Sequence, residues 1–184
     1  MAQCGTADDG CGGRLNCGTC AMGSECVDNQ CVCIDDEAEP NDVDVRAFRL
    51  GTFADEPDTM MSFDIYTLHT TDDVDFYRVR VVDAAMSNPT IRVTLTGVPT
   101  VDDWEVAMWF TCDTGGDASL CNSGTDDATF GVGCADTTGT TGMARVQLQT
   151  FCATTDEDGD LLIRIMSSTW TNACMPYHLT VEVS

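Results

Sequence analysis

Lysine is absent from this chain. Its 8 basic residues are all arginines and stand against 31 acidic ones, which gives a formal net charge of −23 over 184 residues. Nucleic-acid binding draws most of its affinity from phosphate neutralisation by Lys and Arg, and anionic membrane surfaces attract cationic proteins in the same way. The composition therefore argues against nucleic acid and anionic membranes as partners and favours divalent cations. A solvated acidic surface suited to a salty environment accounts for most of the carboxylates in any case.

Long apolar runs are also missing. No segment approaches the roughly 20 apolar residues that a bilayer-spanning helix needs. The opening MAQCGTADDG has no charged region followed by an apolar one, so it does not read as a signal peptide. We therefore expect no membrane insertion and, for a secreted protein, a signal that has already been removed.

Histidine is scarce, and the usual catalytic signatures are not found. The two histidines are His69 and His178, and the sequence contains no G-x-S-x-G nucleophile elbow. A Ser-His-Asp set would depend on one of these histidines, and no serine is marked out by its surroundings. With 31 acids, nothing selects a carboxylate pair for glycoside hydrolysis. A copper site of thioethers and imidazole would need His69, whereas methionines usually fill cores. The sequence predicts a protein that is not an enzyme.

Cysteine, in contrast, is abundant. Twelve cysteines in so short a chain predict an oxidising compartment and a disulfide framework. Seven precede residue 36 and five follow it. Both numbers are odd, so complete pairing requires at least one bridge between the two segments. We expect Cys112–Cys121 and Cys152–Cys174 to pair locally and Cys134 to reach the N-terminal segment, although spacing alone leaves connectivity open.

Zinc is the alternative use of these cysteines. Cys17 and Cys20 form a C-x-x-C pair. A structural zinc site needs a second such pair or histidines at suitable spacing, and neither lies nearby in the sequence. Disulfides are therefore the preferred interpretation.

The chain divides into two segments with different physical character. Residues 1–36 hold too few large apolar side chains to fold by burial, so cross-links must stabilise them as a small disulfide-rich cap. An acidic linker with a proline follows. Residues 37–184 contain short runs in which apolar and polar residues alternate, which is typical of strands with one buried face. These runs are 75–82, 90–96, 104–111, 145–149, 161–165 and 177–183. The pattern predicts an all-β fold, a jelly-roll-like, two-sheet antiparallel β-sandwich behind an N-terminal disulfide-rich cap.

The second segment resembles a known family. Glu37-Ala-Glu-Pro-Asn-Asp42, then Asp73-Val-Asp-Phe-Tyr77, and the closing strand that begins at Tyr177 are similar in order to the bacterial pre-peptidase C-terminal (PPC) domain. The likeness covers most of residues 37–184. It departs from the family in a Gly- and Asp-rich insertion at 113–144 and in the entry to the penultimate strand at 158–162. The cap resembles cysteine-rich repeats in secreted proteins of predatory and gliding soil bacteria.

The resemblance implies a calcium site at the linker. PPC domains, and the related collagen-binding domains of clostridial collagenases, often hold calcium there. The ligands carried over by position are Glu37, Glu39, Asn41, Asp42, Asp72 and Asp75. Carboxylates and amide carbonyls are the hard oxygens of which Ca²⁺ takes six to eight. The alternative is that Glu-Pro-Asn-Asp only forms a capped turn.

Three aromatic residues are candidates for ligand binding. Trp109 lies opposite the apolar row of its strand, and Trp170 and Tyr66 are further candidates. Exposed rings can stack on sugar faces; the alternative is burial under the second sheet or the insertion. The sequence thus predicts a secreted, non-catalytic, calcium-stabilised module that attaches to extracellular polysaccharide or matrix protein. The alternative functions are a structural protein that self-assembles into a surface layer or fibre, and a fragment of a larger hydrolase.

Overall fold

The computed structural model describes residues 3–8, 10–20, 23–70, 72–84, 88–115, 119–153, 155, 157–169, 174 and 176–184. Within these residues the chain is almost entirely β-structure, with one short 3₁₀ turn. The elements are β1 (Gly5–Asp8), β2 (Arg14–Gly18), β3 (Ser24–Val27), β4 (Gln30–Cys33), η1 (Asp44–Arg46), β5 (Phe48–Ala54), β6 (Thr59–Thr67), β7 (Val74–Val82), β8 (Thr90–Thr96), β9 (Trp104–Cys112), β10 (Leu120–Ser123), β11 (Thr125–Asp127), β12 (Gly133–Thr137), β13 (Ala144–Gln149), β14 (Gly159–Ser167) and β15 (Pro176–Val183). No helix in the described residues is long and apolar enough to cross a membrane.

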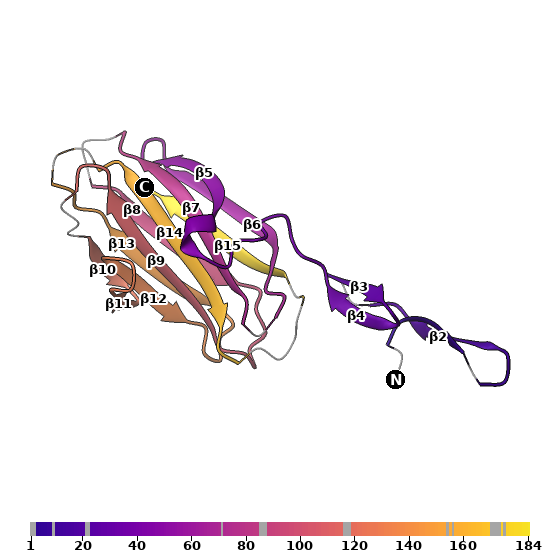
Figure 1. Cartoon of the computed structure of the whole chain (residues 1–184). Helices are drawn as coiled ribbons and strands as arrows, with labels where there is room; N and C mark the ends of the chain where they lie inside the picture. The colour runs from indigo at the N-terminus through magenta and orange to yellow at the C-terminus, as the bar shows by residue number, and fades with distance from the viewer. Residues whose placement is uncertain are drawn as a thin grey trace.

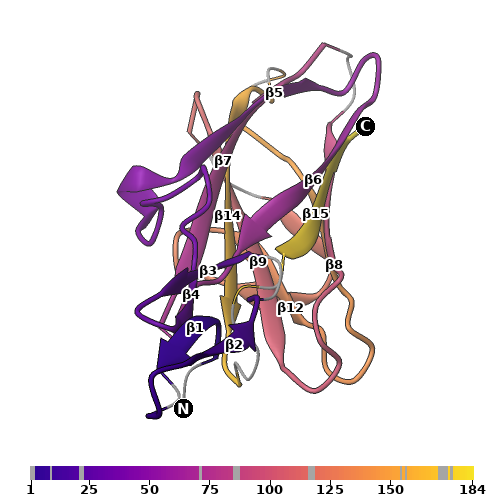
Figure 2. The same cartoon turned by 90° about the vertical axis from the view of Figure 1, so that its right-hand side faces the viewer.

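Strands β5 to β15 form two sheets that pack face to face (Figures 1 and 2). One sheet has the order β10-β13-β8-β15-β6 and the other the order β11-β12-β9-β14-β7-β5. Apart from the hairpin β11–β12, each connection in this region carries the chain from one sheet to the other. This confirms the predicted sandwich, and the alternation between sheets is typical of a jelly-roll-like arrangement.

The apolar residues of the predicted alternating runs form the hydrophobic core. On β8, Ile91, Val93 and Leu95 are fully buried, whereas the polar residues between them are only partly covered. The inward row of β9 starts at Trp104 and ends at Phe110, and it joins the same cluster from the opposite sheet. All six predicted runs lie in strands of the structure. Period-two patterning therefore located the central strands and the face that each one buries.

Of the sandwich strands outside the insertion, β5 and β6 were not among the predicted runs. β5 contains Gly51, which has a φ of +136°, and its pairing with β7 shifts register between Arg49 and Gly51. Such a bulge interrupts period-two alternation. β5 also runs parallel to β7, while the other strand pairs of the two sheets are antiparallel. In β6, the adjacent apolar residues Met60 and Met61 are both exposed. They interrupt the alternation of apolar and polar residues, so the sequence does not show which face of β6 is buried.

The insertion at 113–144 is part of the sandwich. Its strands β10 and β12 extend one sheet each, and β11 pairs with β12 at the sheet edge. Phe130, in the β11–β12 connection, folds over the outer face of β9 and contacts Trp109 edge to face at a centroid distance of 5.0 Å. The insertion therefore covers a sheet face that the sequence pattern alone would leave in solvent.

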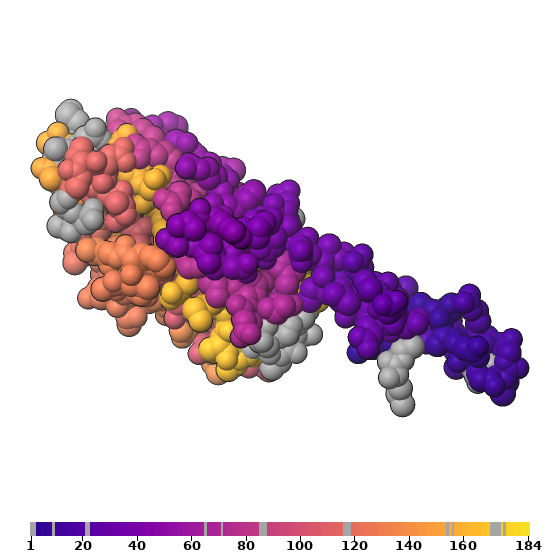
Figure 3. Space-filling view, in the orientation of Figure 1, coloured from indigo at the N-terminus to yellow at the C-terminus, as the bar shows by residue number. Residues whose placement is uncertain are grey.

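The described part of the cap forms two hairpins, β1–β2 and β3–β4, that project from one end of the sandwich (Figures 1 and 3). Two internal bridges, Cys4–Cys26 and Cys20–Cys31, cross-link them. The sulfur of Cys20 is thereby committed to a disulfide, which excludes the C-x-x-C zinc site considered from the sequence. Disulfides stabilise the fold of the cap because it has almost no hydrophobic core.

The predicted bridge between the segments is present, but its partners differ from the expected ones. Cys33, at the end of β4, pairs with Cys174, just before β15. The expected local pairs and the expected role of Cys134 are wrong. The sandwich bridges are instead Cys112–Cys152 and Cys121–Cys134. Cys134 on β12 is fully buried in the core and faces β10 of the opposite sheet, so it cannot reach the cap.

The Cys33–Cys174 bridge closes the longest loop of the chain's described disulfides, with a sequence separation of 141. Removing it with Cys33→Ser and Cys174→Ser should lower the free energy of unfolding by about 2–4 kcal/mol, because the unfolded chain regains loop entropy. Chemical denaturation measures the change. The control is Cys4→Ser with Cys26→Ser, which should leave the sandwich transition unchanged, and equal losses in both double variants would contradict the prediction.

Candidate metal centre

The linker between cap and sandwich binds to the end of β6. The carboxylate of Asp36 accepts hydrogen bonds from Ala38 N (2.8 Å) within the linker and from Thr67 N (2.7 Å) on β6. Asn41 pairs with β7, since Phe76 N donates to Asn41 O at 3.0 Å. These contacts hold the acidic linker against the sandwich edge over residues 36–41.

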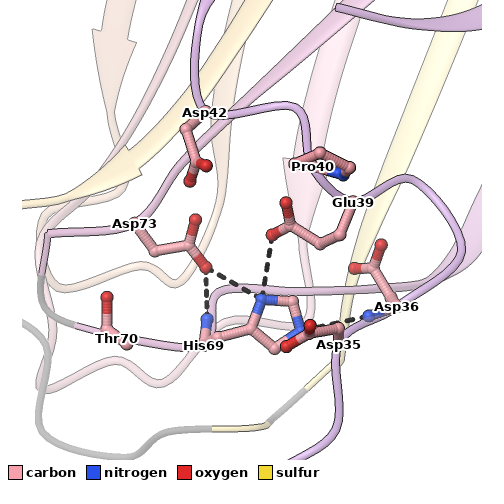
Figure 4. Close-up of a pocket in the computed structure, with 8 residues that line it drawn as sticks. All are labelled: Asp35, Asp36, Glu39, Pro40, Asp42, His69, Thr70 and Asp73. Carbon is pink, nitrogen blue, oxygen red and sulfur yellow. Dashed lines mark hydrogen bonds and ion pairs between the residues drawn. The ribbon is translucent and has the colours of Figure 1, made fainter. Parts of the chain in front are cut away.

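A pocket of about 450 Å³ opens between this linker and the β6–β7 connection (Figure 4). Five carboxylates and one imidazole line it. The lining residues are Asp35, Asp36, Glu39, Pro40, Asp42, His69, Thr70 and Asp73. Among the described residues no arginine lines the pocket, so within that lining His69 is the one side chain that can carry a positive charge.

His69 lies at the centre of the pocket. Its Nδ1 is 3.0 Å from Glu39 Oε1 and 3.1 Å from Asp73 Oδ2. Its Nε2 is 2.8 Å from Ile34 O, at the end of the cap. Burial alone would lower the pKa of His69, but the neighbouring carboxylates of Asp73 and Glu39 outweigh it and raise that pKa. The ring therefore connects the cap, the linker and the β6–β7 connection.

The two carboxylates that face His69 each accept a backbone hydrogen bond in addition to their contact with the ring. Asp73 accepts a hydrogen bond from the backbone N of His69 as well as the contact to its ring, and its side chain is only 4 % exposed. Glu39 Oε2 accepts the backbone N of Asn41 at 3.0 Å. Burial raises the pKa of both carboxyl groups above their ordinary values. Ionised carboxylates at this depth need a cation or a proton nearby.

A second group of oxygens lies directly behind Glu39. The amide nitrogen of Asn41 donates to Phe76 O at 3.3 Å. In the reversed orientation the amide nitrogen donates instead to Asp75 Oδ1 and to Glu39 Oε2, each at 3.2 Å. Asn41 is fully buried and Asp75 is 1 % exposed. The side-chain amide of Asn41 thus lies between two carboxylates at a buried point of the linker.

Asp75 is held from its other side by two tyrosines. Its Oδ2 accepts hydrogen bonds from Tyr77 OH at 3.2 Å and from Tyr177 OH, and the two hydroxyls also contact each other. Burial raises the pKa of Asp75 well above its ordinary value, with Tyr177 opposing the shift. Burial likewise raises the pKa values of both tyrosines. One carboxylate therefore connects the last strand, β15, with β7 and the linker.

The six expected calcium ligands do not all come together. Glu39, Asn41 and Asp75 converge, and Asp42 is exposed at the pocket rim. Glu37 and Asp72 are exposed and lie outside the pocket lining. Glu37 and Asp72 are close in sequence to the other expected ligands, but this proximity does not place their side chains in the group.

Two of the three aromatic candidates are buried. Trp109 is 1 % exposed because Phe130 covers it; its indole N donates to Asp127 O at 3.1 Å, and the Arg164 guanidinium lies over the ring. Tyr66 is 2 % exposed within the main core. For these two rings the structure therefore agrees with the alternative weighed from the sequence, burial rather than exposure at the surface. Trp170 lies outside the described residues.

His69 and Asp73 are pocket residues that the sequence analysis did not select. His69 appeared there only as an unsupported catalytic or copper candidate, and Asp73 only as part of the Asp-x-Asp motif. The available signal was the i, i+4 spacing of a histidine and an aspartate just before a strand that begins at Val74. Without the linker's position, that spacing does not single out Glu39 as the third member.

Comparison with known proteins adds little. No family model matches the chain, and no curated protein matches its sequence. One solved structure with partial overlap is that of CorA, a surface-associated copper-binding protein important in copper acquisition by Methylomicrobium album BG8. The identity is 13 %, the TM-score is 0.35, and the match covers 73 % of this chain and 96 % of that one. A likeness this weak carries no argument, so function must be argued from the site itself.

The tyrosine pair gives a stability prediction. Tyr177→Phe keeps the ring in the core but removes a hydroxyl donor from the buried Asp75, so the free energy of unfolding should fall by about 1–3 kcal/mol. Urea denaturation measures it. Ser62→Ala is the control, because Ser62 is exposed and its bond to Thr180 (3.0 Å) lies at the surface. That variant should stay within about 0.5 kcal/mol of the parent; equal losses would show that the Asp75 network is unimportant.

Proposed function

We propose that this protein is a secreted, non-catalytic binding module in which calcium holds the acidic linker against the sandwich. The observation that carries this proposal is the convergence of two carboxylates, those of Glu39 and the buried Asp75, on the buried side-chain amide of Asn41, which lies 3.2 Å from an oxygen of each. Five disulfides support an oxidising, extracellular setting. The motif order that resembles the PPC domain agrees with both parts of the proposal.

The amide of Asn41 can turn either end toward the two carboxylates. With its nitrogen there, both carboxylates gain a donor at 3.2 Å, but the amide oxygen faces Phe76 O and the 3.3 Å hydrogen bond is lost. With its oxygen there, a cation among the three oxygens keeps that bond and compensates the buried charge on Asp75. Calcium suits the ligand set because it prefers carboxylate and amide oxygens and accepts water at its remaining positions.

The two histidines differ in their surroundings. His178 lies at the surface in a pair with Asp64, with an Nδ1–Oδ1 distance of 2.9 Å. His69 contacts two carboxylates, the buried hydroxyl of Thr67 at 3.1 Å, and the backbone at Ile34 and Asp36. This favours a binding role over hydrolysis. With Trp109 and Tyr66 buried, a polysaccharide or matrix-protein partner would bind polar surface rather than an aromatic platform.

The proposal predicts a calcium-dependent gain in stability. At calcium concentrations about 100 times the dissociation constant, the gain should be about 2.7 kcal/mol, which corresponds to a rise in melting temperature of about 5–11 °C for a chain of this size. Calorimetry of the oxidised protein in EDTA and then in excess calcium measures it. Asp75→Asn should abolish the rise because it removes a converging charge, whereas Asp72→Asn, at an exposed position outside the pocket, should preserve it.

No rise in the parent protein, or an equal rise in Asp75→Asn, would refute the calcium clamp. Light scattering on the same samples tests the alternative of an assembly protein. Polymers that form in calcium and grow with protein concentration would favour self-assembly into a layer or fibre over attachment to a separate partner.

A further inference from the structure

We propose that the pocket contains a second cation site, distinct from the calcium cluster, that binds a nitrogen-preferring divalent ion of the Zn²⁺ class. Its ligands are His69 Nδ1, Glu39 Oε1 and the carboxylate of Asp73. The three groups come from the linker, the end of β6 and the start of β7, and their ligand atoms all lie within 4.8 Å of one another. Figure 4 shows the imidazole between the two carboxylates, with dashed lines to both.

An independent observation at Asp73 points to a ligand. Its Oδ1 is buried and has no hydrogen-bond partner, although the side chain is only 4 % exposed. Figure 4 shows this oxygen turned toward Asp42 and Glu39, on the pocket side. A buried carboxylate oxygen without a donor costs desolvation free energy that a coordinated cation would recover. The direct contacts to His69 satisfy only Oδ2.

The imidazole is oriented as metal-binding histidines usually are. Such a histidine donates its other ring N–H to a carboxylate or backbone carbonyl, which fixes the tautomer and the ring plane. Here Nε2 lies 2.8 Å from Ile34 O, while Nδ1 faces the carboxylates. The backbone N–H of Asp36 also donates to Nε2, at 3.1 Å. When Nδ1 binds a metal, Nε2 carries the proton and donates it to Ile34 O, and the hydrogen bond from Asp36 is given up.

The ligand set selects the class of metal. Imidazole suits Zn²⁺ and its first-row neighbours, whereas calcium takes oxygen only. Tetrahedral bonds of about 2.1 Å place ligand atoms about 3.4 Å apart, and the present N–O distances are 3.0 and 3.1 Å. A shift of a few tenths of an ångström admits the ion. Three protein ligands would leave a fourth position for water.

The site is separate from the calcium cluster except at Glu39. That residue uses Oε1 toward His69 and Oε2 toward Asn41, so one oxygen serves each site. Variants of His69 and Asp73 therefore report on the zinc-class site, and variants of Asp75 report on calcium. The two proposals can fail independently.

The test is a zinc titration of the oxidised full chain in excess calcium, after iodoacetamide treatment so that no thiolate can contribute. Isothermal calorimetry gives the affinity, and long-range ¹H–¹⁵N spectra report on the two imidazoles. We expect the His69 Nδ1 resonance to move on zinc addition while that of His178 stays in place. His69→Asn should weaken zinc binding at least about 100-fold, because even residues that only support a metal ligand are worth about 10–100-fold.

His178→Asn is the matched control and should bind zinc as the parent does, since it removes the chain's other histidine. Asp73→Asn should weaken binding as well. Zinc that binds equally well to His69→Asn, or no zinc binding by the parent, would overturn the proposal. So would a His69 ring that responds only to pH and not to zinc, which would mean that a proton alone balances the two carboxylates. The spectra of the parent protein decide this even if His69→Asn does not fold.

Discussion

The charge on Asp75 is the constraint on which the junction of this protein depends. Its carboxylate is 1 % exposed, with two tyrosine hydroxyls on one side and the side-chain amide of Asn41 on the other. A charge at that depth is unstable unless it is compensated. The hydroxyls supply donors from β7 and β15, and the linker brings the side chains of Asn41 and Glu39 to the opposite side. The position of the linker, and with it that of the pocket, follows from how this group is neutralised.

Much of the fold could be predicted from the sequence, because the central strands bury one side chain in two. The rows on β8 and β9 identify both sheets, and the odd cysteine counts required a bridge to the cap. The partners of that bridge could not be predicted, since loop lengths do not show that Cys134 on β12 points into the core. The bulge at Gly51 hid β5, because a shift of one residue breaks the alternation.

The candidate site was predictable only in part. Glu39, Asn41 and Asp75 were selected from the motif, and the structure brings their side chains together. His69 was considered only as a lone histidine, because its partners lie 30 residues upstream and four residues downstream and converge only when the linker packs on β6. Trp109 illustrates the opposite error. Its strand pattern correctly placed it on the outer face, but Phe130 from the insertion covers that face.

The bridge between Cys33 and Cys174 has a mechanical consequence. It attaches the end of the cap to the chain just before β15, a strand that is hydrogen-bonded to β8 on one side and β6 on the other. A pulling force on the cap would therefore pass through a covalent bond into the interior of a five-stranded sheet. The linker and its carboxylates lie in parallel with that path, so the linker would stay unstretched while the module is under load.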